Sequence, residues 1–382
     1  MKRLITICAV VMVILVISGV ANAVIVDFTA TSSASDETLV CLWQSDKKGA
    51  VSMTFDDGLT NQKQNAFPIL QEHGFKATFF IVTDSLNWSH EVYMNASDIQ
   101  ALSAAGQEIG SHTVTHPNLT TLSHDDRVAE LSQSQSYLQA LTGQNVDTLA
   151  YPYGNSNSDV INDTKDYYIA ARGIASPYLN ASSPVGNQWY NLSVIFPHPY
   201  SGASDDEAVA NLNSRADQAA SQQKWAIEIF HSITDDDTGY DPLSSGHLDE
   251  HLDYLTANEP NLWVGPMGTV AKYIYERNAA QIDTVVYTDY ITVDVNCGLD
   301  SQFDVPLTLL TPCPTDWLTL PLTAHQGETI LSAFHYNKSG VDYICYDAIP
   351  NAGTVTLGIP EPAAVCLLGL GALSLISRKR SV

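Results

Sequence analysis

The stretch AVSMTFDDG, residues 50–58, joins an apolar strand-like run to two adjacent carboxylates and a glycine. Further strand-like runs recur along the chain, at residues 77–82, 107–111, 147–151, 167–172 and 225–231. Between them, residues 61–73 and 125–141 have helical periodicity, and Gly74 and Gly143 follow as helix stops. Strands that alternate with helices predict parallel strands with crossover helices, hence an α/β barrel or a doubly wound sheet.

The composition and periodicity of the sequence change near residue 281. The stretch before it, residues 269–280, predicts the last helix of the α/β part. Residues 283–357 are rich in Thr, Val, Tyr and Leu and show little helical periodicity. This pattern predicts a small all-β sandwich of roughly six or seven short strands. We therefore expect an α/β domain at residues 50–281 and an all-β domain at 282–358. Residues 24–49 are expected to form a lead-in strand and loop packed on one of these domains.

The amino-terminal residues 1–23 have the three parts of a secretory signal peptide. Lys2 and Arg3 precede an almost wholly apolar run at residues 4–20, and Ala21-Asn22-Ala23 fits a cleavage site between small residues. The mature chain is expected to start near Val24. An uncleaved membrane anchor is the alternative.

The carboxyl-terminal residues 359–382 contain Pro360-Glu361-Pro362, an apolar run at 363–376 and the basic cluster Arg378-Lys379-Arg380. The apolar run is shorter than the about 17–25 residues that span a bilayer comfortably. The order of the three parts resembles the PEP-CTERM sorting signal of bacteria that make exopolysaccharide. That resemblance implies cleavage by an exosortase and a location at the cell envelope or extracellular surface. A plain C-terminal anchor is the alternative.

Composition limits the partners of the chain. Its 382 residues contain 42 Asp and Glu against 17 Lys and Arg, which gives a formal charge of −25. Such a surface repels phosphate backbones, so the charge argues against nucleic-acid binding. Four cysteines lie in the mature region, at Cys41, Cys297, Cys313 and Cys345. An even number in an exported protein permits two disulfides, and free buried thiols are the alternative.

Two clusters of polar residues follow strand-like runs and carry candidate chemistry. Asp56 and Asp57 end the first run, and two adjacent carboxylates repel each other unless a cation or proton compensates. His112 and His116 follow the run at 107–111, and their spacing lets both imidazoles reach one ion. One carboxylate and two neutral histidines suit Zn²⁺, Co²⁺ or a similar divalent ion. The alternatives without a functional site are a solvated Asp-Gly turn for the first cluster and a chance histidine pair for the second.

Together these motifs resemble the polysaccharide deacetylase domain (NodB homology, carbohydrate esterase family four) over roughly residues 48–280. The resemblance implies a distorted (β/α) barrel, in which Asp56 is the catalytic base. It also implies that Asp57, His112 and His116 hold the metal ion.

The segment Ala150-Tyr151-Pro152-Tyr153-Gly154 resembles the family's Arg-x-Pro-Tyr-Gly motif. The resemblance assigns Pro152 and Tyr153 to substrate binding, and the Tyr153 backbone N–H to stabilisation of the oxyanion. Ala150 replaces the arginine that orients the base in the family. Arg172, at the end of the run 167–172, is a candidate to reach the site instead, and an ordinary salt bridge is its alternative role.

The run 225–231 ends in His231, which matches the family's general acid. A histidine side chain has an unperturbed pKa near 6.5, which lets it carry a proton at neutral pH. The family commonly pairs this histidine with an aspartate that has no clear counterpart here, and Asp205, Asp206 and Asp235 are nearby candidates. The second pair, His247 and His251, is expected to be a satisfied surface pair.

These features predict an exported, metal-dependent hydrolase that removes acetyl groups from an N-acetylated polysaccharide. Three alternatives stay open. The missing arginine at position 150 is compatible with a catalytically impaired carbohydrate-binding protein on the same fold. An O-acetyl esterase and an amidase acting on a small amide would use the same residues.

Overall fold

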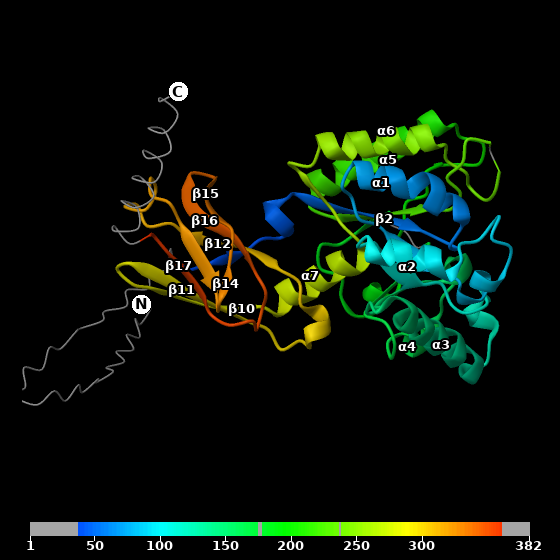
Figure 1. The fold of residues 1–382 in the computed structure, drawn as a ribbon, viewed down its shortest axis with the longest axis horizontal. Coiled ribbons are helices and arrows are strands. Elements are labelled where there is room, and N and C mark those ends of the chain that lie inside the picture. The colour runs from blue at the N-terminus through cyan, green and yellow to red at the C-terminus, as the bar shows by residue number, and fades with distance from the viewer. Residues whose placement is uncertain (1–36, 175–177, 237, 361–382) are drawn as a thin grey trace, which may run out of the picture.

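The protein is described here by a computed structural model, which places residues 37–174, 178–236 and 238–360. The predicted signal peptide, and the predicted sorting signal from residue 361 onward, lie outside these residues. Figure 1 shows two parts, a barrel surrounded by helices at the right and a β-sandwich at the left. In the described part of the chain, no helix is long and apolar enough to cross a membrane.

The first part is a curled, mostly parallel sheet with the order β6-β5-β4-β3-β2-β8-β7, in which β9 also pairs with β2. Only β7 runs antiparallel to its neighbour, β8. The strands are β2 (Gly49–Phe55), β3 (Thr78–Ile81), β4 (Glu108–Ser111), β5 (Thr148–Ala150), β6 (Ala170–Arg172), β7 (Leu179–Asn180), β8 (Trp225–Phe230) and β9 (Leu262–Val264). All six strands expected from the sequence are present. The strands β7 and β9 carry too short an apolar pattern for sequence analysis to find them.

Residues 192–195 close the gap between the two ends of this sheet. Leu192 forms a parallel bridge with Arg172 on β6, and Ile195 forms one with Glu228 on β8. The backbone bonds agree, because Gly173 N donates to Leu192 O and Ile195 N donates to the carbonyl of residue 227. The sheet therefore closes into a distorted barrel, as the sequence predicted.

Helices surround the barrel and connect its strands (Figure 1). They are α1 (Phe67–Glu72), α2 (Ala96–Ala104), α3 (His124–Thr142), α4 (Ser158–Thr164), α5 (Asp205–Gln222), α6 (Ser245–Ala257) and α7 (Met267–Ala279), and the π-helical turn η2 (Gln62–Ala66) leads directly into α1. The predicted helices 61–73 and 125–141 correspond to η2 with α1 and to α3. Gly143 ends α3 in a left-handed conformation, with φ of 73°, which glycine adopts without steric cost.

The second part is a sandwich of two antiparallel sheets. One sheet has the order β1-β12-β16-β15 and the other β10-β11-β17-β13-β14. The strands are β1 (Leu39–Val40), β10 (Gln281–Val286), β11 (Tyr290–Asn296), β12 (Leu307–Pro312), β13 (Thr323–Gln326), β14 (Thr329–Ile330), β15 (Ala333–Lys338), β16 (Val341–Ala348) and β17 (Val355–Gly358). The lead-in segment thus contributes β1 to the sandwich rather than to the barrel, and the predicted all-β architecture is confirmed.

The two parts share one apolar core. A single cluster of buried side chains includes Phe80 and Ile227 of the barrel, Val270 and Ile274 of α7, and residues of both sandwich sheets such as Val293. Tyr273 of the same helix donates a hydrogen bond to Cys41 O at 2.9 Å. Because α7 packs against both parts, separating them would expose apolar surface to water.

The four cysteines of the described chain are free thiols. Cys41 and Cys345 are both buried against Leu310. However, Cys41 follows β1 and Cys345 lies on β16, and β12 runs between these strands. Two strand spacings amount to about 9.6 Å, beyond the roughly 7 Å over which a disulfide can join two Cα atoms. The structure therefore shows neither of the two disulfides that the sequence permits.

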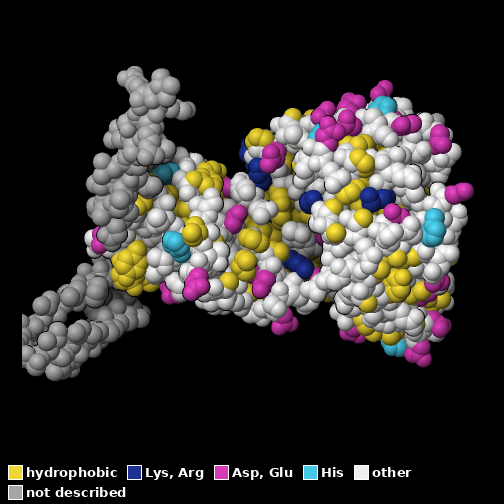
Figure 2. Space-filling view, in the orientation of Figure 1, with side chains coloured by type: hydrophobic (Ala, Val, Ile, Leu, Met, Phe, Trp, Pro, Cys, Tyr) yellow, Lys and Arg dark blue, Asp and Glu magenta, His cyan; other side chains and the backbone are white. Residues whose placement is uncertain are grey.

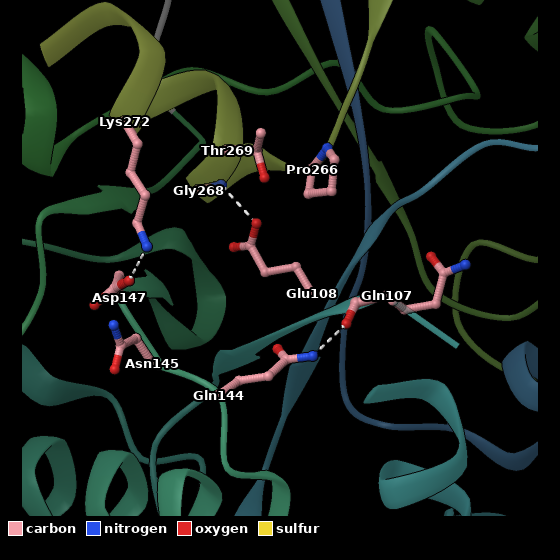
Figure 3. A pocket seen from close by; sticks show the side chains of 10 residues that line it. Gln107, Glu108, Gln144, Asn145, Asp147, Pro266, Gly268, Thr269 and Lys272 are labelled. Carbon is pink, nitrogen blue, oxygen red and sulfur yellow. Dashed lines mark hydrogen bonds and ion pairs between the residues drawn. The ribbon is translucent and has the colours of Figure 1, made fainter. Parts of the chain in front are cut away.

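The start of α7 docks onto the barrel through Glu108, opposite the end where functional groups collect. Glu108 accepts a hydrogen bond from Gly268 N at 2.8 Å (Figure 3) and another from the Thr148 hydroxyl at 2.7 Å. Burial raises the pKa of this carboxyl group, even though those two bonds act in the other direction. A β-carbon added to Gly268 would lie 2.7 Å from Glu108 Oε1. An alanine here therefore forces the Glu108 carboxylate or the start of α7 to move.

We predict that Gly268→Ala lowers the free energy of unfolding by about 1–3 kcal/mol, because the added methyl group pushes α7 away from Glu108. Gly246→Ala is a matched control at the same second position of α6, where no atom lies within 4 Å of the added carbon. That control is expected to be neutral or to stabilise by about 0.5–1 kcal/mol. Denaturant unfolding measures both, and equal effects would contradict the docking role of Glu108.

Candidate active site

The residues expected to carry chemistry lie at the carboxyl ends of the barrel strands and line one pocket of about 270 Å³. They are Asp56 and Asp57 after β2, His112 and His116 after β4, Tyr153 after β5, Arg172 at the end of β6 and His231 after β8. Sequence analysis did not find four further lining residues, Tyr151, Ile174, Phe196 and Ile229. Tyr151 lies inside the segment 150–154 and Ile229 lies two residues before His231, but sequence analysis gave neither side chain a role, and Ile174 and Phe196 belong to no motif.

Three ligand atoms converge at the centre of the pocket, and they come from Asp57, His112 and His116. Asp57 Oδ1 lies 3.6 Å from the Nε2 atom of each histidine, and the two Nε2 atoms are 3.1 Å apart. An ion with ligand bonds of about 2.0–2.2 Å places neighbouring donors roughly 2.8–3.6 Å apart. The separations therefore fit a common divalent ion.

The hydrogen bonding of His112 prepares it for this role. Its Nδ1 lies 2.7 Å from Ala150 O, and a carbonyl oxygen only accepts, so Nδ1 carries the proton. Nε2 then presents a lone pair to the ligand cluster, the arrangement that a carbonyl partner gives metal-bound histidines. Burial lowers the pKa of His112 to about 4, so the ring is neutral at physiological pH.

The carboxyl group of Asp57 needs a positive charge beside it. Burial raises its pKa to about 6, and the neighbouring charge of Asp56 adds to the shift. A carboxylate that is both desolvated and next to another carboxylate is destabilised in its ionised form. A bound cation relieves that cost. The donor set and its charge thus both fit a divalent metal ion.

Asp56 and Arg172 form a buried ion pair across the mouth of the barrel. The Arg172 guanidinium contacts Asp56 Oδ1, and both side chains are at most 4% exposed. Burial by itself raises the pKa of Asp56, but the charge of Arg172, with smaller contributions from His112 and His231, holds it below its usual value. Arg172, the candidate named from the sequence, therefore does reach Asp56. The Asp56 Oδ2 atom is not engaged by Arg172 and lies 3.9 Å from His112 Nε2.

Backbone strain concentrates around the pocket. Asp57, Thr113, His116 and Tyr153 have positive φ values of 71°, 67°, 61° and 60°. A positive φ is rare outside glycine, and for a β-branched residue such as Thr113 it is a genuine outlier. Such conformations cost of order 1–3 kcal/mol each and persist where the surrounding structure enforces them, often at functional sites.

The segment after β5 places Tyr153 at the pocket entrance. Tyr153 is 61% exposed, and its ring packs edge-on against the His116 ring, with 4.7 Å between the centroids. Pro152, by contrast, is buried and does not line the pocket, so the structure does not bring it to the substrate. Of the two residues predicted to bind substrate in this segment, Tyr153 lines the pocket and Pro152 does not.

His231 lies on the opposite wall, with 8% of its surface exposed. Its ring stacks on Phe196 at 6.5 Å and meets Tyr240 edge-on at 4.7 Å. His231 Nδ1 is buried and has no hydrogen-bond partner among the described residues. Aromatic side chains, rather than a carboxylate, thus hold this ring.

None of the three candidate aspartates pairs with His231. Asp205 binds His198 and the backbone N–H of Ser244, Asp206 binds His247, and Asp235 accepts from the backbone N–H of residue 245. The expectation of a surface pair was wrong for His251, which is fully buried. It forms an ion pair with the buried Glu228 of β8 at 3.1 Å. The period of helix α6 brings His251 to its inner face, a position that the polar sequence around it concealed.

We predict that Zn²⁺ raises the melting temperature of the metal-free protein strongly above about pH 7 and weakly near pH 5. The folded protein holds the Asp57 proton more tightly than the unfolded chain does. Stability from this group is therefore lost as the pH rises from the ordinary carboxyl pKa to about 6, and a cation restores it. Calorimetry with and without Zn²⁺ measures the effect.

His116→Gln is expected to abolish this Zn²⁺-dependent rise, whereas His90→Gln, at an exposed histidine, is expected to retain it. An equal rise in both variants would place the ion elsewhere.

We predict that Arg172→Met lowers the free energy of unfolding by about 3–5 kcal/mol, because it leaves the buried Asp56 charge unpaired. Adding Asp56→Asn is expected to recover part of the loss. Lys338→Met, which breaks an ion pair in which the lysine side chain is 43% exposed, is expected to cost less than about 1 kcal/mol. Denaturant unfolding measures all three, and similar losses in Arg172→Met and Lys338→Met would contradict the account.

Comparison with known proteins places this site in a family context. Residues 44–171 match the family described as Polysaccharide deacetylase. Gellan lyase from a Bacillus species is 28% identical over 91% of this chain, but the alignment covers 14% of that protein. Chitin deacetylase from Colletotrichum lindemuthianum is 30% identical over 32% of this chain and 55% of its own length. The chain thus spans only part of the length of these relatives.

Among solved structures, the Xyl-CE4 domain of a multidomain xylanase from the hindgut metagenome of Trinervitermes trinervoides has a TM-score of 0.42 and 17% identity, covering 58% of this chain and 89% of that domain. The family match covers the strands that carry the ligand triad, Asp56 and Tyr153, and it ends one residue before Arg172. The sequence match and the metal-binding geometry together support a polysaccharide deacetylase domain within this chain.

Proposed function

We propose that this protein is an exported, Zn²⁺-dependent hydrolase that removes N-acetyl groups from a polysaccharide. The observation that carries the proposal is the convergence in one pocket of a ligand triad, a separately held carboxylate and a histidine. These are the groups that hydrolysis of an amide needs. The family match and its chitin deacetylase relative favour the same chemistry.

Asp57, His112 and His116 would hold the metal ion. When bound, a Zn²⁺ ion supplies Lewis-acid chemistry, because it polarises a carbonyl and lowers the pKa of water. Two neutral histidines and one carboxylate leave a net positive charge at such a centre, which suits the negative charge that develops on an amide oxygen during hydrolysis.

Asp56 is the general base of the proposed mechanism. Arg172 engages Oδ1 and keeps the carboxyl group ionised at neutral pH, because it holds the pKa low. The Oδ2 atom remains on the triad side of the carboxylate, where it takes a proton from the attacking water. Arg172 thus orients the base and maintains its charge, at the cost of some basicity.

His231 donates a proton to the leaving amine from the opposite wall. The aromatic rings of Phe196 and Tyr240 fix the plane of the imidazole. The Tyr153 backbone N–H, held by the strained turn after β5, donates to the oxyanion. Each step therefore uses a group from a different strand end.

The pocket walls favour a neutral sugar polymer. Tyr153 and Tyr240 are 61% and 64% exposed at its entrance, and aromatic rings present flat apolar faces on which pyranose rings stack. The lining carries one Lys or Arg side chain, Arg172, which is committed to Asp56. Figure 2 also shows acidic side chains gathered near α6, so the surrounding field does not attract an anionic polymer.

The gellan lyase relative raises a second candidate, an eliminating lyase on an acidic polysaccharide. Its alignment extends across 91% of this chain, including the sandwich. Elimination next to a uronate requires a positive charge that neutralises the substrate carboxylate. Arg172 is the basic side chain of the pocket lining, and Asp56 already neutralises it. The lining thus leaves that charge to a metal ion at the triad, and it is the family match over residues 44–171 that favours hydrolysis over elimination.

Arg172 also bears on whether the site is catalytically competent. The absence of an arginine at position 150 was the reason to consider a catalytically impaired binding protein. Because Arg172 pairs with Asp56, that absence no longer argues for impaired catalysis. An O-acetyl esterase would use the same groups but a different leaving atom, and a small-amide amidase would differ only in the size of its substrate. Export, and exosortase processing at residues 359–382, are part of the proposal and rest on the sequence of the two ends.

We predict that the protein comprising residues 24–358 releases acetate from chitin oligomers, poly-N-acetylglucosamine or peptidoglycan when Zn²⁺ or Co²⁺ is present. Asp56→Asn is expected to lower kcat at least about 100-fold and to retain Zn²⁺ binding, because Asp56 is not a ligand. Asp253→Asn, whose side chain is 78% exposed, is the matched control and is expected to retain activity.

Assays of acetate, of free amine and of ultraviolet-absorbing unsaturated sugars distinguish the candidates. Acetate with free amine supports N-deacetylation, acetate without amine indicates an esterase, and unsaturated sugars indicate a lyase. Chelator-insensitive acetate release, or full activity of Asp56→Asn, would contradict the mechanism.

A further inference from the structure

Gln62 is a fully buried amide that sequence analysis did not single out, and it reaches three catalytic elements at once. We infer that Gln62 is a positioning residue that sets the metal ligand Asp57, the base Asp56 and the acid His231 relative to one another. This inference rests on the proposed function for the roles of those residues. The hydrogen bonds of Gln62 from which the inference is argued do not depend on those roles.

The Gln62 side chain closes the turn that carries Asp57. Its Nε2 donates to Asp56 O at 2.5 Å, before the turn, and its Oε1 accepts from Leu59 N at 3.2 Å, after it. Between these contacts Asp57 and Gly58 both have positive φ, 71° and 68°. One side-chain amide thus replaces the backbone bonds that a strained turn cannot make by itself.

The same side chain ties two strands together where they end. Gln62 Nε2 also donates to His231 O at 2.9 Å. Asp56 N donates to Phe230 O at 2.9 Å one step earlier in the ladder between β2 and β8. Gln62 therefore extends the pairing of these strands beyond their last regular hydrogen bond, to the residues that bear the base and the acid.

Only a primary amide satisfies this arrangement. The two backbone carbonyls require donors and Leu59 N requires an acceptor, and asparagine is one methylene shorter. Glutamate would place a carboxylate against two carbonyl oxygens, and methionine would leave all three backbone groups without a partner. The π-helical turn η2, which begins at Gln62, is a further irregularity of the kind often found at functional sites.

Gln135 provides a matched control at the other end of the barrel. Its Nε2 donates to Val146 O at 2.9 Å and to Tyr167 O, just before β5 and β6 begin. Like Gln62, it ties two neighbouring strand ends through their backbone carbonyls. It lies among the amino-terminal strand ends, away from the catalytic pocket. Its loss removes the same kind of contact without touching the site.

The test compares Gln62→Met and Gln135→Met with the wild type, by acetate release, by melting temperature of the metal-free protein and by calorimetric Zn²⁺ titration. Both variants are expected to melt at lower temperature. Gln62→Met is expected to lose at least about tenfold in kcat with KM within about twofold, because small displacements of catalytic groups cost rate rather than binding. It is also expected to bind Zn²⁺ at least about threefold more weakly. Gln135→Met is expected to keep both kcat and Zn²⁺ affinity.

Equal effects of the two substitutions on kcat and Zn²⁺ affinity would overturn the inference and leave Gln62 a purely structural residue. If Gln62→Met does not fold, Gln62→Asn, which keeps the amide but shortens it, takes its place with the same expectations. If the wild type releases no acetate, the proposed function fails, and the Zn²⁺ titration still decides the inference. Weakened binding in Gln62→Met alone would support it, and unchanged binding would overturn it.

Discussion

The buried ion pair between Asp56 and Arg172 is the constraint on which the rest of the site depends. Two charges that are nearly removed from water are tolerated only when they compensate each other closely. Their strands, β2 and β6, are not neighbours, so the pair spans the mouth of the barrel. It can form because residues 192–195 close the ring between β6 and β8 and hold Arg172 in register. Barrel closure and the position of the base are thus linked.

This link explains how the chain accommodates Ala150. The end of β5 holds a metal-ligand candidate through its backbone, because the Ala150 carbonyl accepts from His112 Nδ1. That bond fixes the tautomer of a metal ligand, while the positive charge comes from the next strand. Arg172 reaches Asp56 because its guanidinium lies over the Phe80 ring, 4.7 Å from the centroid, inside the barrel.

The sequence was sufficient for the parts of the site that follow strand ends. Asp56, Asp57, His112 and His231 each come directly after an apolar run, and parallel strands bring their carboxyl ends to one edge. The closure by residues 192–195 has no regular pattern, and it was not predictable. Gln62 also escaped detection, because its partners are backbone atoms and leave no trace in residue spacing.

A second group of misses concerns the surroundings of His231. The sequence offered only Asp205, Asp206 and Asp235 as candidate partners, without a matching pattern, and none of them pairs with His231. Phe196 and Tyr240 hold the ring instead, and they come from a bridge segment and a loop whose positions depend on tertiary packing. His251 was misjudged for the same reason, since burial beside Glu228 depends on how α6 lies against β8. Polar residues in a helix are usually exposed, and the exceptions follow from packing that one sequence does not reveal.

The Arg172–Asp56 account is tested most directly by a double-mutant cycle on kcat/KM for acetate release, with Arg172→Met, Asp56→Asn and the double variant. If Arg172 acts through Asp56, its loss lowers kcat/KM strongly in the wild type, and the double variant is no slower than Asp56→Asn alone. Additive losses in the double variant would contradict the account, because Arg172 would then act on substrate or metal independently of the base.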